Sequence, residues 1–547
     1  MKIVIPMSGR GQRFINQGYK EPKPLIVMDG KPIIEHVVDL FPGENDFIFI
    51  CANDHLENTD MRTVLNKVAP KGKIVGIEPH KLGPIYAVQQ VYDLIDDSEE
   101  VIVNYCDFGA YWDYDDFLAH TRNRGADGAI PAYKGFHPHM LGTTNYAFMR
   151  DDNQWMLEIQ EKRPFTDDRM SEYASSGTYY FKSGSIMKRY LDRTVERALD
   201  LNGEYYVSVV YNLLIEDGLK VSIYEIQHML QWGTPEDVAE YNYHSEYFKK
   251  MVTHVPFSAP DQNTVNLIPL AGEGSRFKNE GYITPKPMIE VSGKPMIIQA
   301  FDSYPKSEFS RFIVLQSHCD AYGIDELLLN KTPNPKVMVL DHVTEGQAIT
   351  AALGVDEAIM NSPLMIAACD NGLLIDQVEY EAQLNDPNCD VICLTFRNNP
   401  TVGKNPNGYG YVSVGADGYI SGCSVKKPMT DDPMNEHAIV GAFYFKKASD
   451  FIRGVKYIKT NNIRVNNEFY IDSIMGILGE LDLKGRVLDC LYESWGTPND
   501  YKTFVYWQSF FSKAQFHPYE LERDPFVNPD RLEALKKQFN TFQQENL

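Results

Sequence analysis

A chain of 547 residues is too long for one hydrophobic core, and the usual domain size predicts two to four domains. Its 43% hydrophobic and 12% aromatic residues suffice for an ordinary core in each domain, which excludes an intrinsically disordered chain. The formal net charge of −23 argues against a broad nucleic-acid surface, because such a surface needs clustered Lys and Arg. Any phosphate ligand must therefore be bound by a few local cations.

The first residues alternate between strand-like and helix-like segments. Apolar runs at residues 2–6, 46–52 and 99–107 are typical of buried strands, and the last of them ends on an aspartate. Residues 32–41 and 84–95 are typical of helices. This alternation predicts an α/β fold with a mostly parallel sheet covered by helices on both faces. Ligands of such sheets bind beyond the carboxyl ends of the strands.

The N-terminal pattern recurs in the second half of the chain. The segment SGRGQRF reappears as AGEGSRF, and each copy has a Pro-Lys-Pro centred ten residues after its arginine. The offset between equivalent residues is 263 at first and becomes 264 after a one-residue insertion. Paired positions are Arg13 and Arg276, Lys23 and Lys286, Gly83 and Gly346, Asp107 and Asp370, Lys162 and Lys426, and Glu204 and Glu468. This is the signature of a whole-domain duplication.

The repeat sets the expected domain boundaries. We expect the first copy to span residues 1–250 and the second to span 265–510, beginning with a strand. Residues 251–264, polar and with two prolines, are the expected linker. Residues 511–547 are expected to form a C-terminal helical tail, in which residues 529–539 make one helix started by a proline.

A glycine-rich turn directly follows the first strand of each copy. Gly9 and Gly11, and likewise Gly272 and Gly274, let the backbone approach a phosphate and direct N–H groups toward it. The turn is not the dinucleotide-binding fingerprint, because an arginine replaces the third glycine, and it is not a Walker A loop, because no GK[ST] follows. The arginine offers a bidentate fork to phosphate oxygens, and the lysine between two prolines offers a compact charge.

Taken together, these motifs resemble the nucleotidyltransferase superfamily that makes NDP-sugars, whose signature is G-x-G-x-R-[LF], then P-K-P-[LM], a strand-end aspartate, and later EK-P and GTPED-like segments. The resemblance covers both copies and implies two tandem Rossmann-like nucleotidyltransferase domains. It also implies the reaction: the phosphate of a sugar 1-phosphate attacks the α-phosphorus of an NTP, and pyrophosphate leaves. The implied partners are an NTP and a phosphorylated small-molecule acceptor, with Mg²⁺ as the cofactor.

The resemblance also assigns residue roles. The catalytic residues it implies are Arg13, Lys23, Arg276 and Lys286. The nucleotide-binding residues are Gly9, Gly11, Glu78, Gly83, Gly272, Gly274, Asp341 and Gly346. The acceptor-binding residues are Glu161, Lys162, Glu204, Gly410, Lys426 and Glu468. Carboxylates where relatives have glutamine, at positions 78 and 341, can only accept hydrogen bonds, which suits an exocyclic amine such as cytosine N4.

The two copies depart from the family pattern on the acceptor side. Val425 stands where the first copy has Glu161, and Tyr146 stands where the second has Gly410. We therefore expect unequal acceptor pockets, with a carboxylate beside the phosphate-binding lysine in the first copy alone.

The metal ligands implied by the resemblance also differ. Asp107 and Asp370 match the metal-binding aspartate, and Gln231 stands at the second ligand position of the first copy. The second copy has Ser494 there, a poorer ligand, so its metal site depends on whether the neighbouring Glu493 compensates.

Other functions stay open. Within the leading class, the acceptor can be a small phosphorylated alcohol or amine, as in cytidylyltransferases whose turn has the GSRF form. A metal-dependent glycosyltransferase is a second class, because Asp113-x-Asp115 resembles its metal motif; pyrophosphate release would distinguish the two. A third is a binding or regulatory role for one copy or both.

The remaining sequence features concern the cellular setting. Eight cysteines without a C-x-x-C pair predict buried, reduced thiols. Nothing at the start resembles a signal peptide, and no apolar run reaches membrane-spanning length, so we expect a cytoplasmic protein without membrane or nucleic-acid partners. A homo-oligomer is compatible with the sequence, which leaves the oligomeric state open.

Overall fold

The computed structural model describes residues 1–257 and 259–541. It divides into two compact units, Met1–Asn242 with Thr541, and Tyr243–Asn540. The division falls inside helix α9 (Pro235–Met251), before the predicted boundary at residue 250. The cause is the second half of this helix, where Phe248 packs against Phe504 and Phe511 of the second unit.

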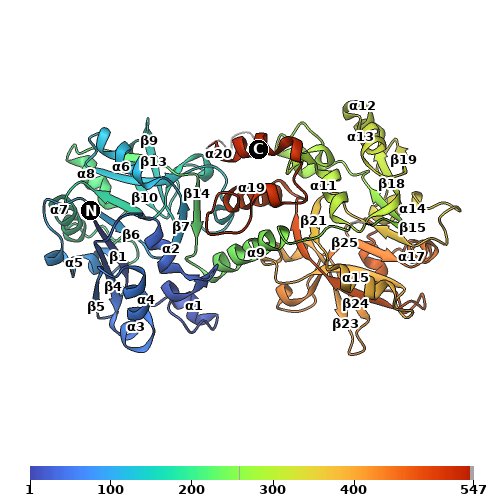
Figure 1. The fold of residues 1–547 in the computed structure, drawn as a ribbon, viewed down its shortest axis with the longest axis horizontal. Coiled ribbons are helices and arrows are strands. Elements are labelled where there is room, and N and C mark those ends of the chain that lie inside the picture. The colour runs from blue at the N-terminus through green and yellow to red at the C-terminus, as the bar shows by residue number, and fades with distance from the viewer. Residues whose placement is uncertain (258, 542–547) are drawn as a thin grey trace. The chain divides into compact units, whose positions relative to one another are not determined.

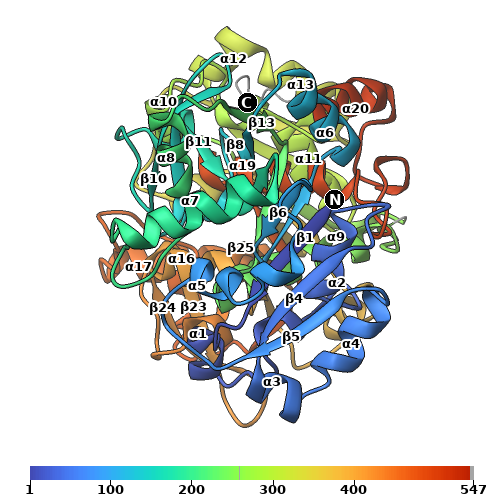
Figure 2. The same cartoon turned by 90° about the vertical axis from the view of Figure 1, so that its left-hand side faces the viewer.

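In the first unit, four parallel strands form one side of a ten-stranded sheet in the order β5-β4-β1-β6 (Figure 1). Figure 2 shows β1, β4 and β5 side by side. The sheet continues from β6 through β12, β8, β13, β10, β9 and β11 with mostly antiparallel pairing. Its strands are β1 (Lys2–Met7), β4 (Phe47–Ala52), β5 (Lys73–Ile77), β6 (Val101–Asn104), β8 (Gly128–Tyr133), β9 (Ala147–Asp152), β10 (Trp155–Glu161), β11 (Tyr173–Ser175), β12 (Thr178–Phe181) and β13 (Val221–Glu225).

Two short strand pairs and nine helices complete the description of this unit. The pairs are β2 (Val27–Met28) with β3 (Lys31–Pro32), and β7 (Phe108–Tyr111) with β14 (His228–Gln231). The helices are α1 (Gln12–Asn16), α2 (Ile33–Asp39), α3 (Asn53–Asn58), α4 (Met61–Val68), α5 (Pro84–Gln89), α6 (Tyr114–Asn123), α7 (Gly184–Glu196), α8 (Val210–Glu216) and α9.

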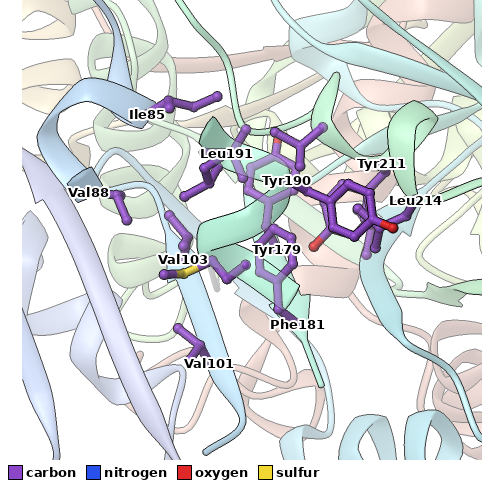
Figure 3. Close-up of a cluster of buried hydrophobic side chains, with 14 of the residues drawn as sticks. Ile85, Val88, Val101, Val103, Tyr179, Phe181, Tyr190, Leu191, Tyr211 and Leu214 are labelled. Carbon is purple, nitrogen blue, oxygen red and sulfur yellow. The ribbon is translucent and has the colours of Figure 1, made fainter. Parts of the chain in front are cut away.

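The central strands are buried on both faces. Ile3, Val4 and Ile5 are each 0% exposed, although successive side chains of a strand point to opposite faces. On one face, Figure 3 shows side chains of α5, α7 and α8 gathered against the strands. The labelled residues there are Ile85, Val88, Val101, Val103, Tyr179, Phe181, Tyr190, Leu191, Tyr211 and Leu214. The predicted α/β class is confirmed, but the sheet is mixed where a mostly parallel one was predicted, because the strands beyond β6 pair mainly antiparallel.

Two predicted elements end earlier than the sequence pattern indicated. The helix predicted over residues 84–95 stops at Gln89 and resumes as a 3₁₀ turn, Tyr92–Leu94. The strand predicted over residues 99–107 ends at Asn104, so Asp107 lies in the turn between β6 and β7. This turn places the aspartate at the carboxyl edge of the parallel strands.

The second unit repeats this strand order. Its sheet runs β19-β18-β15-β20-β25-β22-β26, with β23 pairing β25 and β24, and β21 pairs separately with β27, as β7 does with β14. The pairing directions of β15 with β18 and β20, and of β25 with β20 and β22, match those of β1 and β12. This shared topology is what a duplicated domain is expected to have.

The elements of the second unit have the following bounds. The strands are β15 (Asp261–Pro269), β16 (Glu290–Val291), β17 (Lys294–Pro295), β18 (Ser307–Leu315), β19 (Pro335–Leu340), β20 (Leu364–Ile366), β21 (Asn371–Leu374), β22 (Val391–Phe396), β23 (Gly410–Val414), β24 (Ile420–Val425), β25 (His437–Phe445), β26 (Gly485–Asp489) and β27 (Leu491–Ser494). The helices are α10 (Ser275–Asn279), α11 (Met296–Ser303), α12 (Gln316–Tyr322), α13 (Ile324–Lys331), α14 (Gln347–Leu353), α15 (Gln377–Leu384), α16 (Pro400–Lys404), α17 (Ala448–Thr460), α18 (Asp472–Met475), α19 (Pro498–Phe511) and α20 (Leu532–Asn540).

The linker and the tail differ in detail from their predicted forms. β15 begins at Asp261, inside the predicted linker 251–264, because Asp261 already pairs with Ser307 of β18. In the tail, a 3₁₀ turn at Pro529–Arg531 precedes α20, where a single helix was predicted. Residues 542–547 of the predicted tail lie outside the described residues.

All eight cysteines are free, and five of them are buried. Among the described residues, no helix combines the length and the apolar character that crossing a bilayer requires.

The buried aromatic cluster of the first unit should dominate its stability. Phe181 is 0% exposed and stacks on Tyr211 with ring centroids 5.1 Å apart. We expect Phe181→Ala to lower the free energy of unfolding by about 3–5 kcal/mol through lost burial and the cavity left behind. Urea unfolding monitored by circular dichroism measures this. The control Leu157→Ala, at a side chain that is 56% exposed, should stay within about 0.5 kcal/mol of the parent.

Candidate functional site

The glycine turn of the first unit joins β1 to α1. Gly11 caps α1 with a φ of 62°, a left-handed conformation that favours glycine. A Cβ added at Gly9 would meet no atom within 4 Å, so open space lies over this residue. A Cβ at Gly11 would lie 3.7 Å from the Cβ of Lys23. The turn therefore covers the lysine of the Pro-Lys-Pro segment while its outer side stays open.

Beneath this turn, the Lys23 Nζ donates to Asp107 Oδ2 at 2.7 Å. Burial is the largest influence and lowers the pKa of Lys23, but the charge and hydrogen bond of Asp107 together with Cys106 outweigh it, so the pKa is raised and the ammonium stays charged. Lys23 is held by a 3₁₀ turn, Lys23–Leu25, between two prolines, and Asp107 by the turn after β6. The structure thus brings two predicted site residues into direct contact.

Two adjacent cavities, of about 410 Å³ and 840 Å³, open on this ion pair. Both are lined by Gly11, Gln12, Lys23, Tyr105, Asp107 and Tyr206. The larger one continues along Gly9, His80 and Gly83, and the smaller one along Arg13, Glu161 and Lys162. The predicted nucleotide-binding and acceptor-binding residues therefore mostly separate into neighbouring cavities that meet at Lys23 and Asp107.

A chain of side-chain hydrogen bonds begins at Lys162 on the wall of the smaller cavity. Lys162 Nζ donates to Tyr206 Oη at 2.6 Å, and Tyr206 donates to the Glu204 carboxylate. Glu161, at the end of β10, accepts a hydrogen bond from Ser208 Oγ at 2.5 Å. Burial raises the pKa of Glu161, while the Ser208 hydrogen bond opposes the shift. Glu161 and Lys162 line the smaller cavity, whereas Glu204 lines the larger one and is connected to Lys162 through Tyr206.

Gly83 allows a close backbone contact between the loop beside the larger cavity and the segment that carries Tyr206. Its φ is 86°, and an added Cβ would lie 2.6 Å from both the backbone N and the backbone O of Tyr205. Tyr205 in turn donates its N–H to the Leu82 carbonyl at 3.0 Å. Only glycine allows the Glu-x-Tyr segment to approach this closely. Gly346 has the same relation to Phe469, at 2.6 Å and 2.7 Å.

Two predicted site residues of the first unit make little contact with the rest of the site. Arg13 lines the smaller cavity but is exposed, and no hydrogen bond or ion pair joins it to another described residue. Glu78 follows β5 and accepts from Asn53 Nδ2 at 2.7 Å; it is absent from the described lining of both cavities. The predicted base contact of Glu78 therefore has no support in this geometry.

Of the predicted metal ligands of the first unit, Gln231 ends β14 and Asp107 lies in the turn just before β7. Gln231 pairs with Phe108, the residue after Asp107, across β14 and β7. Gln231 Nε2 donates to Asp237 Oδ2 at 2.7 Å, which leaves the amide oxygen, the atom that a cation needs, on the opposite side. No group of three or more His, Cys, Asp or Glu residues in the described part of the chain is arranged to hold a metal. One carboxylate and one amide oxygen do fit Mg²⁺, which is usually completed by phosphates and water.

The second unit repeats the ion pair. Lys286 Nζ donates to Asp370 Oδ2 at 2.6 Å, and again burial is the largest influence and lowers the pKa of the lysine, while Asp370 and Cys369 together raise it above its ordinary value. Gly274 caps α10 with a φ of 62° over Lys286, and a Cβ at Gly272 would meet nothing within 4 Å. Arg276 is exposed.

The nucleotide side of this unit has a cavity of about 460 Å³ lined by Gly274, Lys286 and Asp341. Asp341 projects into solvent, with its side chain 88% exposed, and binds His342. The second predicted base contact is thus at a cavity rim.

The acceptor side of the second unit corrects one prediction. A carboxylate does act on the phosphate-binding lysine, but it comes from Asp472 at the start of α18: burial lowers the pKa of Lys426, and the charge of Asp472 is the largest influence that opposes the shift. Asp472 is 8% exposed. A Cβ at Gly410 would lie 2.3 Å from its Oδ2. The prediction missed it because position 472 is Ser208 in the first copy. The structure leaves Glu468 exposed on the neighbouring Glu-x-Tyr segment.

The suggestion that Glu493 compensates for Ser494 is wrong. Glu493 accepts from His244 Nδ1 at 2.7 Å and is buried away from the cavity, because neighbours on a strand point to opposite faces. Ser494 Oγ donates to Asp500 Oδ2 at 3.1 Å and accepts from the Gly496 N–H. The second unit therefore presents Asp370 without an amide ligand beside it.

The Asp113-x-Asp115 motif has a structural role. Asp113 is the N-cap of α6, and its Oδ1 accepts from the Asp116 N–H at 2.9 Å. Asp115 is exposed in the first turn of the helix. The glycosyltransferase interpretation loses its main support.

The sequence analysis missed two further pairs of residues. Asp237 and Asp500 follow GTP in both copies at the offset of 263, and Tyr206 and Tyr470 share the offset of 264. The tyrosines lie close to the phosphate-binding lysines, with Lys426 Nζ 5.8 Å from the Tyr470 ring. Their identical offsets were the signal that could have found them.

The fold and this geometry define a class: an α/β protein with a charged Lys–Asp pair under a glycine turn at the carboxyl edge of parallel strands. Residues 3–168 match the family model described as MobA-like NTP transferase domain. The N-terminal unit is thus similar to an NTP transferase domain over residues 3–168, which is less than a third of the chain.

Solved structures with similar folds each align with less than half of this chain. A nucleoside-diphosphate-sugar pyrophosphorylase from Vibrio cholerae RC9 is 22% identical over 44% of this chain and 98% of its own, with a TM-score of 0.37. A putative glucose-1-phosphate thymidylyltransferase from Bacillus anthracis is 18% identical over 44% and 94%, with a TM-score of 0.37. A CTP:phosphocholine cytidylyltransferase from Streptococcus pneumoniae is 16% identical over 43% and 95%, with a TM-score of 0.34.

Asp237 should make stability depend on pH. Burial raises the pKa of this carboxyl to about 6, against hydrogen bonds from Gln231 and Thr234 that lower it. Between the unfolded pKa near 4 and this value, the folded state binds more protons, so stability falls as pH rises through the window and is level above it. We expect wild type to lose roughly 2 kcal/mol relative to Asp237→Asn between about pH 4 and pH 7. Paired denaturation curves measure the difference; a constant difference would contradict the assignment.

Proposed function

We propose that this chain transfers a nucleoside monophosphate from an NTP to a sugar 1-phosphate with release of pyrophosphate. The observation that carries the proposal is the Lys–Asp ion pair beneath the glycine turn, present in both units at 2.7 Å and 2.6 Å. In the first unit, this pair lies where the two cavities meet, the position that a transferred α-phosphate must occupy between its two substrates.

The proposed roles follow from the lining residues. The turn around Gly9 and Gly11 offers backbone N–H groups to the triphosphate, and Arg13 offers its guanidinium. Lys23 neutralises charge that develops on the α-phosphate, and Lys162 holds the acceptor phosphate. Phosphoryl transfer of this kind depends on positioning and charge neutralisation more than on covalent chemistry. The exposed, unengaged side chain of Arg13 supports this role, because no described partner has to be displaced.

Mg²⁺ is the proposed cofactor, held by Asp107 with the amide oxygen of Gln231 in the first unit and by Asp370 in the second. When bound, it supplies charge that polarises the α-phosphate and orients the leaving pyrophosphate. Asp107 and Asp370 would then exchange part of their contact with the lysines for the cation.

A phosphorylated amino alcohol is a second candidate acceptor for the first unit. Four tyrosines line the 410 Å³ cavity, Tyr105, Tyr146, Tyr179 and Tyr206, together with the Glu161 carboxylate. Aromatic faces combined with a carboxylate suit an ammonium group. A matrix of NTPs against sugar 1-phosphates, polyol phosphates and phosphorylated amino alcohols, with pyrophosphate as the readout, decides between the two.

The arginines of the two turns should report which units are active. Removing one charge-assisted phosphate contact from the transition state costs roughly 3 kcal/mol, about a hundredfold in rate. We expect pyrophosphate release to be abolished in the double variant Arg13→Ala with Arg276→Ala, or in one single variant if one unit is active. Arg197→Ala, an exposed arginine of α7's C-cap, is the matched control. Full turnover in the double variant would refute the proposal.

The aspartates should report the metal. We expect Asp107→Asn and Asp370→Asn to lower kcat of the active unit and to shift its Mg²⁺ titration to higher concentration, because an amide keeps the shape but gives up the charge. Asp115→Asn serves as the control and also tests the glycosyltransferase alternative. Superimposable Mg²⁺ titrations for wild type and both site variants would mean that these aspartates only position the lysines.

A further inference from the structure

The residues predicted to face the acceptor differ between the two units at three equivalent positions. The first unit has Tyr146, Glu161 and Ser208, and the second has Gly410, Val425 and Asp472 at the equivalent positions. Each set contains one carboxylate, one small residue and one larger residue without charge. The carboxylate thus changes its place in the wall from one unit to the other.

In the first unit, the carboxylate belongs to the long side chain of Glu161, at the end of β10. Ser208 supports it through the 2.5 Å hydrogen bond from its hydroxyl. Tyr146 lies on the neighbouring segment, where its backbone carbonyl accepts from the Lys162 N–H at 2.7 Å. Ser208 is 0% exposed and its hydroxyl is the hydrogen-bond partner of the Glu161 carboxylate, so glutamate at 161 depends on serine at 208.

In the second unit, the carboxylate belongs to the short side chain of Asp472, at the position where the first unit has Ser208. Its Oδ2 occupies the space that a Cβ at Gly410 would need, at 2.3 Å, so aspartate at 472 requires glycine at 410. Val425 cannot hydrogen-bond with its side chain. No side chain among the described residues forms a hydrogen bond with the Asp472 carboxylate, which is more than nine-tenths buried, and Lys426 is the nearest charge that acts on it. A buried carboxylate without such a partner is costly unless a ligand supplies one.

We propose that Asp472 is the acceptor-recognition carboxylate of the second unit, and that the exchange at these three positions gives the two units different acceptors. This inference rests on the proposed function. The second unit takes a phosphorylated acceptor whose hydroxyl or ammonium group donates to Asp472 while Lys426 binds its phosphate. A site built to hydrogen-bond a buried donor discriminates strongly against molecules that lack it.

The test uses the full chain with the first unit silenced by Arg13→Ala, so that pyrophosphate release reports on the second. Across the panel of sugar 1-phosphates, polyol phosphates and phosphorylated amino alcohols, Asp472→Asn should lower kcat/KM for the preferred acceptor by about thirtyfold or more. The KM for the NTP should change by less than about threefold. The preferred acceptor itself tells a hydroxyl donor from an ammonium donor. Asp482→Asn, at an exposed residue with a φ of 59°, is the matched control.

Thermal unfolding separates recognition from a structural role. Removing a buried charge without a partner should leave the Tm of Asp472→Asn unchanged or raise it while activity falls. A lower Tm with a proportional loss of folded protein would show that Asp472 is structural.

In the Arg13→Ala background, transplanting the first unit's layout into the second with Gly410→Tyr, Val425→Glu and Asp472→Ser should shift the second unit's acceptor preference toward that of the first unit, which is measured separately in an Arg276→Ala background. Pyrophosphate release that Asp472→Asn leaves unchanged would overturn this inference alone, as would a second unit that is silent while the first is active. Absence of release from wild type with every substrate pair would overturn the proposed function and this inference with it.

Discussion

The ion pair between Lys23 and Asp107 is the interaction around which the site is organised. Two backbone turns position the pair. A proline-flanked 3₁₀ turn holds the lysine, and a turn after a buried strand holds the aspartate. An ammonium taken out of water needs a carboxylate at short distance, and Asp107 Oδ2 lies 2.7 Å from the Lys23 Nζ. The charge is therefore fixed in place and permanently present before any substrate arrives, which is what electrostatic preorganisation requires.

The glycines follow from this constraint. Gly11 turns the chain so that it passes over the lysine, and Gly83 lets the Glu-x-Tyr segment come within contact of the loop beside the larger cavity. Because Tyr206 of that segment binds Lys162, the position of the acceptor-side lysine depends on a glycine of the nucleotide side. The same dependence connects Gly346, Phe469 and Tyr470 in the second unit. Substitution of either glycine should therefore alter both the nucleotide side and the acceptor side of its unit.

The sequence predicted this central part because both copies repeat it. Lys23 and Asp107 stand at fixed offsets from Lys286 and Asp370, and strand-end placement put each pair at one edge of the sheet. The sequence failed where contacts join segments that differ between copies. Asp472 gave no repeat signal, since its counterpart is a serine, and only the close approach of α18 to β23 reveals it. Glu493 was misjudged because a one-residue step along a strand changes the face to which a side chain points. Asp113 was ambiguous until its capping hydrogen bond was seen.

This contrast between repeated and exchanged residues has a physical basis. The Lys–Asp pair acts on the α-phosphate, which is chemically the same for every NTP and every acceptor, so both copies need the same charges in the same geometry. The acceptor wall faces the part of the substrate that varies. There, the requirement is only that a buried carboxylate find a donor and that its neighbours leave it room. Glutamate with serine and tyrosine meets this requirement in one way, and aspartate with glycine and valine in another. Because Ser208 hydrogen-bonds the Glu161 carboxylate and Asp472 requires glycine at 410, single substitutions between the two sets should clash or leave a carboxylate without its partner, and the exchange is expected to function only as a set.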